Sequence, residues 1–282
     1  MPLPRPDADD DKDDRGRVLV IGGSTQVAGA VLLAGVAALR AGAGKLQLAT
    51  VASAAPSLGI AVPEALVVAL RASRTGEIAG SHAVPALVDH IESVNAVLVG
   101  PGMSSDHAAH ALLASLVRRV GASAILVLDA AAITALAHDD ALLSSLEGRA
   151  VLTPHAGEMA SLLGIDKSEV NRDPGGVARV AAERFGAVVA LKGAETYIAD
   201  PDRALYRYSE GSVGLATSGS GDTLAGIIAG LAARGAAPAQ AAAWGAYLHG
   251  AAGRALARRL GPVGFLAREL LDELPALLRR LA

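Results

Sequence analysis

Thr217-Ser218-Gly219-Ser220-Gly221-Asp222 places small residues and one carboxylate directly before Thr223–Leu231, an apolar stretch with helical spacing. Small residues leave backbone N–H groups free to bind an anion, and a helix N-terminus adds about half a positive charge. Such a segment can hold a phosphoryl group during transfer, with the aspartate as base toward the attacking hydroxyl. The alternative is a glycine-rich turn that Asp222 caps. We interpret Gly226 and Gly230, one helical turn apart, as sites of close helix packing.

A second candidate for chemistry is Thr153-Pro154-His155-Ala156-Gly157-Glu158, which follows an apolar run and precedes a helix expected from about Gly157. His155 is a candidate for ligand contact. Glu158 can lie at the helix N-terminus or help to organise magnesium through water. The alternative is that both side chains only cap the helix.

Two more ionisable side chains follow apolar runs. Lys192 comes directly after Val188–Leu191 and can bind phosphate, although a solvated lysine at a strand edge fits equally well. Asp129 follows Ile125–Leu128 and is a candidate for holding a magnesium-bound water or for a polar network.

Several familiar sites are excluded. Gly44-Lys45 lacks the flanking residues of a P-loop, no Gly-x-Gly-x-x-Gly follows the first apolar run, and no His-Glu-x-x-His occurs. The absence of cysteine removes disulfides, thiolate metal sites, Fe–S clusters and cysteine nucleophiles. His107 and His110 lack a closed set of ligands, so we interpret them as surface residues.

The candidate residues need elements that bring them together, and the sequence indicates alternating strands and helices. Short apolar runs between Ala/Leu-rich helical segments predict an α/β fold with a mostly parallel sheet covered on both faces. The predicted strands are Val18–Ile21, Leu46–Thr50, Ala96–Val99, Ala124–Leu128, Ala150–Leu152 and Ala187–Leu191. The predicted helices are Ala30–Ala41, Ala108–Val120, Ile133–Ala137, Val177–Phe185, Asp222–Arg234, Pro238–Leu260 and Leu266–Leu281.

Five of these strands run straight into small, polar or ionisable residues. Ligands of open α/β sheets bind outside the carboxyl ends of the strands, so the five ends are expected to form one site. The residues at these ends are Gly22-Gly23-Ser24, Gly100-Pro101-Gly102, Asp129, Thr153-Pro154-His155 and Lys192-Gly193.

Composition is typical of one folded domain. The chain has 282 residues, of which 52% are hydrophobic and 19% charged, and its net charge is −3. We expect an acidic, flexible lead-in over residues 1–16 and a single domain over residues 17–282. Near-balanced charge and few aromatic residues argue against nucleic-acid binding. No signal peptide or membrane segment is apparent, so a cytoplasmic location is expected.

Taken together, the motifs resemble those of the ADP/ATP-dependent NAD(P)H-hydrate dehydratases of the ribokinase-like superfamily. The resemblance covers residues 12 to about 280. Its most specific parts are Val18–Ser24, Ala38–Gly44, Val99–Gly102, Asp129-Ala130, Thr153–Met159, Leu191–Gly193, Gly219–Asp222 and Tyr247-Leu248-His249-Gly250. Ser104, Ala131 and Ser218 differ from the residues usual in that family.

The resemblance implies a ribokinase-like three-layer α/β/α sandwich and a repair reaction on the S-epimer of hydrated NADH or NADPH (NADHX or NADPHX). The family phosphorylates the 6-hydroxyl of the hydrated ring at the expense of ADP, or of ATP in the eukaryotic type, with Mg²⁺. Loss of phosphate then restores NADH or NADPH. The resemblance also implies a homotetramer and a separate epimerase acting in the same pathway.

Site residues follow from the same resemblance. The implied catalytic residues are Gly219, Ser220, Gly221 and Asp222. The implied hydrate-binding residues are Ala30, Gly102, His155 and Asp222. The implied nucleotide-binding residues are Lys192, Gly193, Ala194, Glu195, Thr196 and Gly221. The first alternative is a ribokinase-like kinase of hydroxymethylpyrimidine, a thiazole or a sugar, and the second is a non-catalytic nucleotide sensor.

Overall fold

The computed structural model describes residues 2–4, 9, 11–202 and 204–281. Within them nine strands form one sheet in the order β3-β2-β1-β4-β5-β6-β7-β8-β9. The pairs from β3 to β7 are parallel, and β8 and β9 continue the sheet antiparallel. The strands are β1 (Arg17–Ile21), β2 (Lys45–Val51), β3 (Ala65–Leu70), β4 (Ala96–Val99), β5 (Ile125–Leu128), β6 (Ala150–Leu152), β7 (Val188–Leu191), β8 (Thr196–Ala199) and β9 (Leu205–Tyr208).

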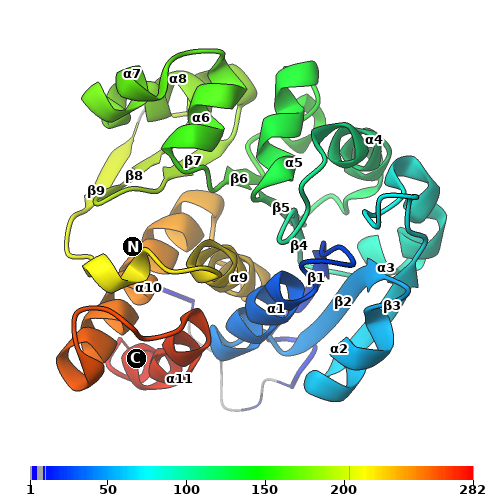
Figure 1. Ribbon diagram of the computed structural model, residues 1–282, viewed down its shortest axis with the longest axis horizontal. Helices are drawn as coiled ribbons and strands as arrows, with labels where there is room; N and C mark the ends of the chain where they lie inside the picture. The colour runs from blue at the N-terminus through cyan, green and yellow to red at the C-terminus, as the bar shows by residue number, and fades with distance from the viewer. Residues whose placement is uncertain (1, 5–8, 10, 203, 282) are drawn as a thin grey trace.

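Helices lie on both sides of this sheet (Figure 1). The α-helices are α1 (Gly29–Arg40), α2 (Ala55–Ala61), α3 (Val88–Ile91), α4 (Asp106–Leu116), α5 (Ala131–Thr134), α6 (Ala156–Leu163), α7 (Lys167–Arg172), α8 (Pro174–Phe185), α9 (Ser220–Ala233), α10 (Pro238–Leu260) and α11 (Ala267–Arg279). Short 3-10 helices occur at η1 (Gly80–Leu87), η2 (Val117–Arg119), η3 (Ala135–His138), η4 (Ser144–Leu146) and η5 (Val213–Leu215).

Alternation along the strands produces two hydrophobic cores. Leu19 and Ile21 of β1 face one core, which η1 and α3 to α8 cover. Val18 and Val20 of the same strand face the other core, which α1, α2 and α9 to α11 cover. Successive side chains of a strand point to opposite faces, so a fully apolar strand requires helices on both sides. The predicted three-layer α/β/α architecture is confirmed.

All six predicted strands are present, and the predicted helices differ from the observed ones mainly at their ends. Three strands escaped prediction. β3 has only one strand neighbour and its side chains are mostly not fully buried. β8 and β9 carry Thr, Tyr and Arg in a short antiparallel hairpin. The runs of β8 and β9 lack the continuous apolar pattern of a strand buried on both faces, whereas β3 has a continuous apolar sequence and the prediction did not include it.

The described part of the acidic N-terminal segment contacts the first residues of β1 and β2. The Asp13 carboxylate pairs with Arg17 at 2.6 Å and also with Lys45. The Gly44 N–H donates to the Gly16 carbonyl at 2.9 Å. The expected flexibility of residues 1–16 falls partly on residues 1, 5–8 and 10, which lie outside the described residues. Among the described helices, none is long and apolar enough to cross a membrane.

Helix α9, which carries the glycine-rich segment, packs closely on α1. A Cβ added at Gly226 would lie 2.1 Å from the Ala34 carbonyl oxygen, and one at Gly230 would lie 2.5 Å from the Ala38 oxygen. Both glycines therefore allow close helix packing, as predicted. This contact fixes the start of α9 relative to α1 and β1.

Replacing Gly226 by Ala should lower the free energy of unfolding by about 1–3 kcal/mol, because the added methyl group forces α9 away from α1. Chemical denaturation measures this loss. Gly59→Ala is the matched control, because its Cβ would meet only the Val67 side chain at 3.7 Å. We expect that helical substitution to be neutral or slightly stabilising. Equal effects of the two substitutions would contradict the packing role of Gly226.

Candidate active site

The glycine-rich segment forms the N-terminus of α9. Gly219 adopts φ +86°, a left-handed conformation that turns the chain into the helix. The Ser220 N–H donates to the Thr217 carbonyl at 3.2 Å. The N–H groups of Gly221 and Asp222 have no acceptor among the described residues. Two free donors at a helix N-terminus form a site for an anion.

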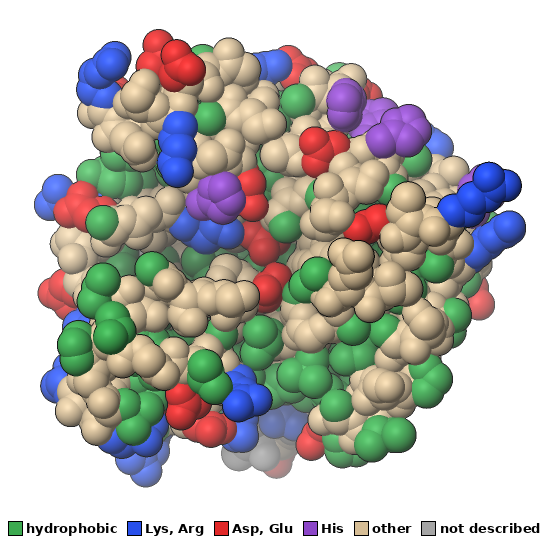
Figure 2. Space-filling model, viewed as in Figure 1, with side chains coloured by type: hydrophobic (Ala, Val, Ile, Leu, Met, Phe, Trp, Pro, Cys, Tyr) green, Lys and Arg blue, Asp and Glu red, His purple; other side chains and the backbone are tan. Residues whose placement is uncertain are grey.

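The Lys192 ammonium lies over this N-terminus. A Cβ added at Gly221 would be 3.2 Å from Lys192 Nζ, so the ammonium lies directly beside the first turn of α9. Lys192 Nζ also lies 2.8 Å from Asp129 Oδ1 and 4.0 Å from Glu158 Oε2. The structure thus brings Lys192, which follows β7, together with Asp129 after β5, Glu158 in the first turn of α6 and the N-terminus of α9. Figure 2 shows charged side chains of both signs around a hollow on this face of the molecule.

Burial makes the electrostatics of this cluster strong. The Lys192 side chain is 18% exposed and that of Asp129 is 4% exposed. Burial opposes the charge of Lys192, but Asp129 and Glu158 outweigh it and raise the pKa of Lys192. Burial, together with the charges of Asp129 and Glu158, raises the pKa of Asp222 to about 7, although Lys192 lowers it. A carboxyl with this pKa is suited to take a proton near neutral pH.

Asp129 belongs to a buried polar network. The Thr153 hydroxyl donates to Asp129 Oδ1 at 2.7 Å, and its oxygen also lies 3.1 Å from the Leu128 carbonyl oxygen. The next residue, Ala130, has φ +49° and ψ −131°, which is strained for a residue with a Cβ. Strain of this kind often occurs at functional sites. The polar-network alternative for Asp129 is therefore confirmed.

His155 and Glu158 cap helix α6. His155 Nδ1 accepts from the N–H groups of Gly157 at 2.9 Å and Glu158 at 3.2 Å. Glu158 Oε2 accepts from the His155 N–H at 2.8 Å, which completes a capping box. The capping function predicted for both residues is confirmed. Ligand contact by His155 stays a prediction, and its side chain is 58% exposed.

The loops after β1 and β4 pack on each other through glycines. The Gly23 N–H donates to the Pro101 carbonyl at 2.6 Å. A Cβ added at Gly102 would lie 2.9 Å from the Ala30 Cβ and 3.2 Å from the Gly23 Cα. Gly102 and Ala30, two of the predicted hydrate-binding residues, are therefore neighbours.

The predicted nucleotide segment forms the turn from β7 to β8. Gly193 and Ala194 are exposed, and Thr196 begins β8. Glu195 Oε2 accepts from the Tyr197 hydroxyl at 2.7 Å and lies 3.8 Å from Arg207. Among these predicted residues, Lys192 is the one placed in direct contact with the acidic cluster.

One residue of the site received no role from the sequence. His249 Nε2 and Ser220 Oγ share a hydrogen bond of 2.9 Å at the start of α9. Burial, aided by the charge of Lys192, lowers the pKa of His249 to about 4, so the ring is neutral near pH 7. Its only sequence signal is its place in Tyr247-Leu248-His249-Gly250, and no spacing argument connects this segment with Ser220.

Comparisons with known proteins identify the family. The family model described as NAD(P)H-hydrate dehydratase matches residues 18–276. The chain belongs to this family. It is also 50% identical to the ADP-dependent (S)-NAD(P)H-hydrate dehydratase of Xanthomonas campestris pv. campestris, over 100% of this chain and 93% of that protein. The resemblance predicted from the motifs is confirmed.

Solved structures agree with the dehydratase family and its fold. A ribokinase-like superfamily protein from Enterococcus faecalis V583 superposes with a TM-score of 0.85 and 27% identity, covering 99% of this chain and 92% of that one. The ADP/ATP-dependent NAD(P)H-hydrate dehydratase of Bacillus subtilis, co-crystallised with ATP/Mg²⁺, superposes with a TM-score of 0.80 and 27% identity, covering 100% and 95%. Membership of the dehydratase family favours that activity over the small-molecule kinase and sensor alternatives.

Replacing Asp222 by Asn should stabilise the protein more at pH 8 than at pH 5. The pKa of Asp222 rises from 3.8 to about 7 on folding. The folded protein therefore holds this proton more tightly than the unfolded chain, and stability falls as the pH rises through that interval. Ionising the folded carboxyl costs up to about 4 kcal/mol, a cost that Asn removes. Urea denaturation at both pH values measures the difference.

Asp89→Asn in α3 is the matched control, because Asp89 is exposed and has no ion-pair partner among the described residues. We expect it to change stability equally at both pH values. A gain from Asp222→Asn that is the same at pH 5 and pH 8 would contradict the electrostatic origin.

Proposed function

We propose that this protein is an ADP-dependent NAD(P)H-hydrate dehydratase that acts on the S-epimer of NADHX and NADPHX. The overall reaction converts the hydrate and ADP to NADH or NADPH, AMP and phosphate. The observation that carries the proposal is the Lys192 ammonium over the free N–H groups of Gly221 and Asp222. The name of the Xanthomonas relative supports the same substrate and donor.

Asp222 is the base of the first step. Its carboxylate takes the proton of the 6-hydroxyl, whose oxygen attacks the terminal phosphorus of ADP while the bond to the AMP oxygen breaks. The N–H groups of Gly221 and Asp222, the helix N-terminus and Lys192 stabilise the negative charge on the phosphoryl group. The protein does not have to rearrange during the transfer, because these hydrogen-bond donors already lie at the start of α9 before the substrate binds.

The second step is loss of phosphate. Phosphate is a better leaving group than hydroxide, and the lone pair of the ring nitrogen assists the breaking of the C6–O bond. Loss of a proton from C5 then restores the ring double bond. The protein contributes the same cationic groups, which stabilise the departing phosphate.

The residues of the site fit a nucleotide-borne Mg²⁺ better than a metal held by protein alone. Among the described residues, no group of three or more His, Asp or Glu can hold a metal ion. Asp129 Oδ1 binds Lys192 and Thr153, whereas Oδ2 has no hydrogen-bond partner in the described part of the chain. Magnesium usually keeps several waters and binds few carboxylates. Asp129, and Glu158 through water, would hold Mg²⁺, which would neutralise phosphate charge.

Three finer features complete the proposal. The enzyme is a homotetramer, as the family resemblance implies. It works in the cytoplasm, where its substrates arise from NADH and NADPH. Because it takes the S-epimer alone, a separate epimerase supplies that epimer from the other one.

Asp222→Asn should lower turnover by about 10²–10⁴-fold, because the base is lost while the anion site remains. The absorbance of the reduced nicotinamide ring follows the reaction after addition of NADHX with Mg²⁺ and ADP, ATP or no nucleotide. We expect a signal with ADP in the native protein. Calorimetry should show ADP binding within a few-fold of the native affinity. Turnover at the native rate in the Asn variant would remove the assigned role, and Asp89→Asn controls for the loss of charge.

The pH dependence gives a second test. Because Asp222 must be deprotonated and its pKa is about 7, kcat/KM should rise with pH through a midpoint near 7. Lys192 lowers that pKa, so Lys192→Met should move the midpoint to higher pH and raise the KM for ADP. Lys192→Arg keeps the charge and should leave the midpoint near its native value. An identical midpoint in the Met variant would contradict the proposed coupling.

A further inference from the structure

A basic pocket of about 580 Å³ opens beyond the β3 side of the candidate active site. The segment after β3, the start of η1 and the N-terminal half of α4 form its walls. Its lining includes Arg71, Arg74, His82 and His107. None of the assigned catalytic or ligand-binding residues lines it, so the pocket is separate from the site of phosphoryl transfer.

The lining of this basic pocket has an unbalanced charge. It contains no Asp or Glu, although the whole chain has a net charge of −3. Arg71, Arg74, His82 and His107 are all exposed, and in the described part of the chain none of them has an ion-pair partner. The Ser81 hydroxyl adds a further donor. Unpaired guanidinium groups with nearby hydrogen-bond donors are the groups that proteins use to bind phosphate.

The wall of the basic pocket also contacts the active-site loops. The Thr25 N–H, after β1, donates to the Gly76 carbonyl at 3.0 Å. The Ser104 hydroxyl, after β4, donates to Glu77 Oε1 at 2.6 Å, and Glu77 is only 8% exposed. One segment, residues 71–80, therefore separates the basic pocket from the loops that carry the predicted hydrate-binding residues.

Sheet order sets the direction in which a bound dinucleotide extends. The predicted donor segment follows β7, at one end of the row of parallel strands, whereas Ala30 and Gly102 follow β1 and β4. With ADP on the β7 side, a dinucleotide whose nicotinamide ring lies at Ala30 and Gly102 would extend toward β2 and β3. Arg71 directly follows β3, the outermost strand on that side of the sheet. NADPHX differs from NADHX only by one phosphate on the adenosine ribose, remote from the nicotinamide ring.

We propose that the basic pocket is a phosphate subsite, with Arg71 and Arg74 as its main ligands. It takes a phosphate monoester: either the ribose phosphate of NADPHX, an assignment that rests on the proposed function, or a free phosphorylated ligand. His82 and His107 contribute ring N–H donors from η1 and α4. This subsite makes Arg71 and Arg74 determinants of the preference between NADPHX and NADHX.

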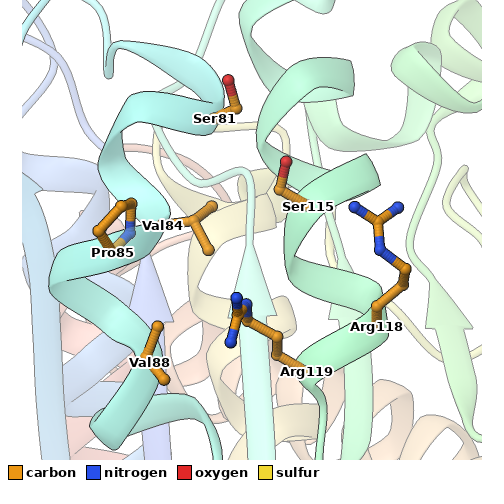
Figure 3. A pocket seen from close by; sticks show the side chains of 7 residues that line it. All are labelled: Ser81, Val84, Pro85, Val88, Ser115, Arg118 and Arg119. Atoms are coloured by element: carbon orange, nitrogen blue, oxygen red, sulfur yellow. The ribbon is translucent and has the colours of Figure 1, made fainter.

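An adjoining pocket supplies the matched control. It has a volume of about 560 Å³, lies between η1 and α4, and shares Ser81 with the basic pocket. Figure 3 shows the Arg119 side chain pointing into this space and the Arg118 side chain pointing away from η1. Arg118→Ala removes one positive charge from the same region of the molecule without changing the lining of the basic pocket.

The test compares the native enzyme, the double variant Arg71→Ala/Arg74→Ala and Arg118→Ala. For the double variant we expect the kcat/KM for NADPHX to fall about tenfold or more, with NADHX changed less than twofold. Arg118→Ala should treat both hydrates as the native enzyme does. Calorimetry with 2′-AMP as a phosphate monoester probe, and with adenosine as the uncharged control, measures the pocket directly.

Each outcome distinguishes the possible ligands. A selective loss with NADPHX assigns the subsite to the tethered ribose phosphate. Unchanged kinetics with loss of 2′-AMP binding assigns it to a free phosphorylated ligand. If the double variant keeps both native kinetics and native 2′-AMP binding, or loses both hydrates equally without loss of 2′-AMP binding, the proposal is overturned. A native enzyme that turns over neither hydrate contradicts the proposed function, while the calorimetry still tests the pocket.

Discussion

Three carboxyl groups, those of Asp129, Glu158 and Asp222, surround a single ammonium group, that of Lys192. The site therefore holds more negative than positive charge, and this excess, together with burial, sets its acid–base properties. The ion pair of Lys192 with Asp129, at 2.8 Å, holds the ammonium above Gly221. One cation cannot neutralise three partly buried carboxyl groups, so the remaining negative charge opposes the ionisation of Asp222, for which no ion pair with Lys192 is seen among the described residues. Burial is the largest cause of the raised pKa of Asp222, and the charges of Asp129 and Glu158 add to it. The carboxylate of Asp129, which is paired with Lys192, thus contributes to the basicity of Asp222.

This cluster requires an unusually close approach of backbone segments. A Cβ added at Gly100 would lie 1.8 Å from the Asp129 carbonyl oxygen, and one at Gly22 would lie 2.2 Å from the Pro101 oxygen. Parallel pairing brings the carboxyl ends of β1, β4 and β5 to the same side of the sheet. The loops that follow these strands can contact one another because Gly22 and Gly100 have no side chain. Because α9 packs directly on the backbone of α1, its N-terminus keeps a fixed place relative to these loops. The many glycine and alanine residues of the chain make these close contacts between loops and helices possible.

The sequence was sufficient for the parts of the molecule that repeat a strong pattern. Fully apolar runs revealed six of the strands, and the polar residues after five of them predicted where the candidate site lies. The sequence was insufficient for contacts between residues that are far apart in the chain and meet only in the folded structure. No local signal places His249 beside Ser220, 29 positions apart. Arg71 and Arg74 follow β3, an apolar run that the sequence prediction did not include. Their shared pocket depends on η1 and α4, which no local pattern places beside them. The nucleotide-binding function of residues 193–196 and the hydrate-binding function of His155 stay predictions.

His249 shows how the same lysine also limits the number of groups that change charge. Burial and the Lys192 charge lower the pKa of His249 to about 4, far below that of Asp222 at about 7. As the pH rises through about 7, the carboxyl ionises while the imidazole is already neutral. The hydrogen bond to Ser220 therefore persists over the pH range in which Asp222 gains its charge. The contact between His249 and Ser220 at the start of α9 is therefore kept while Asp222 becomes able to act as a base.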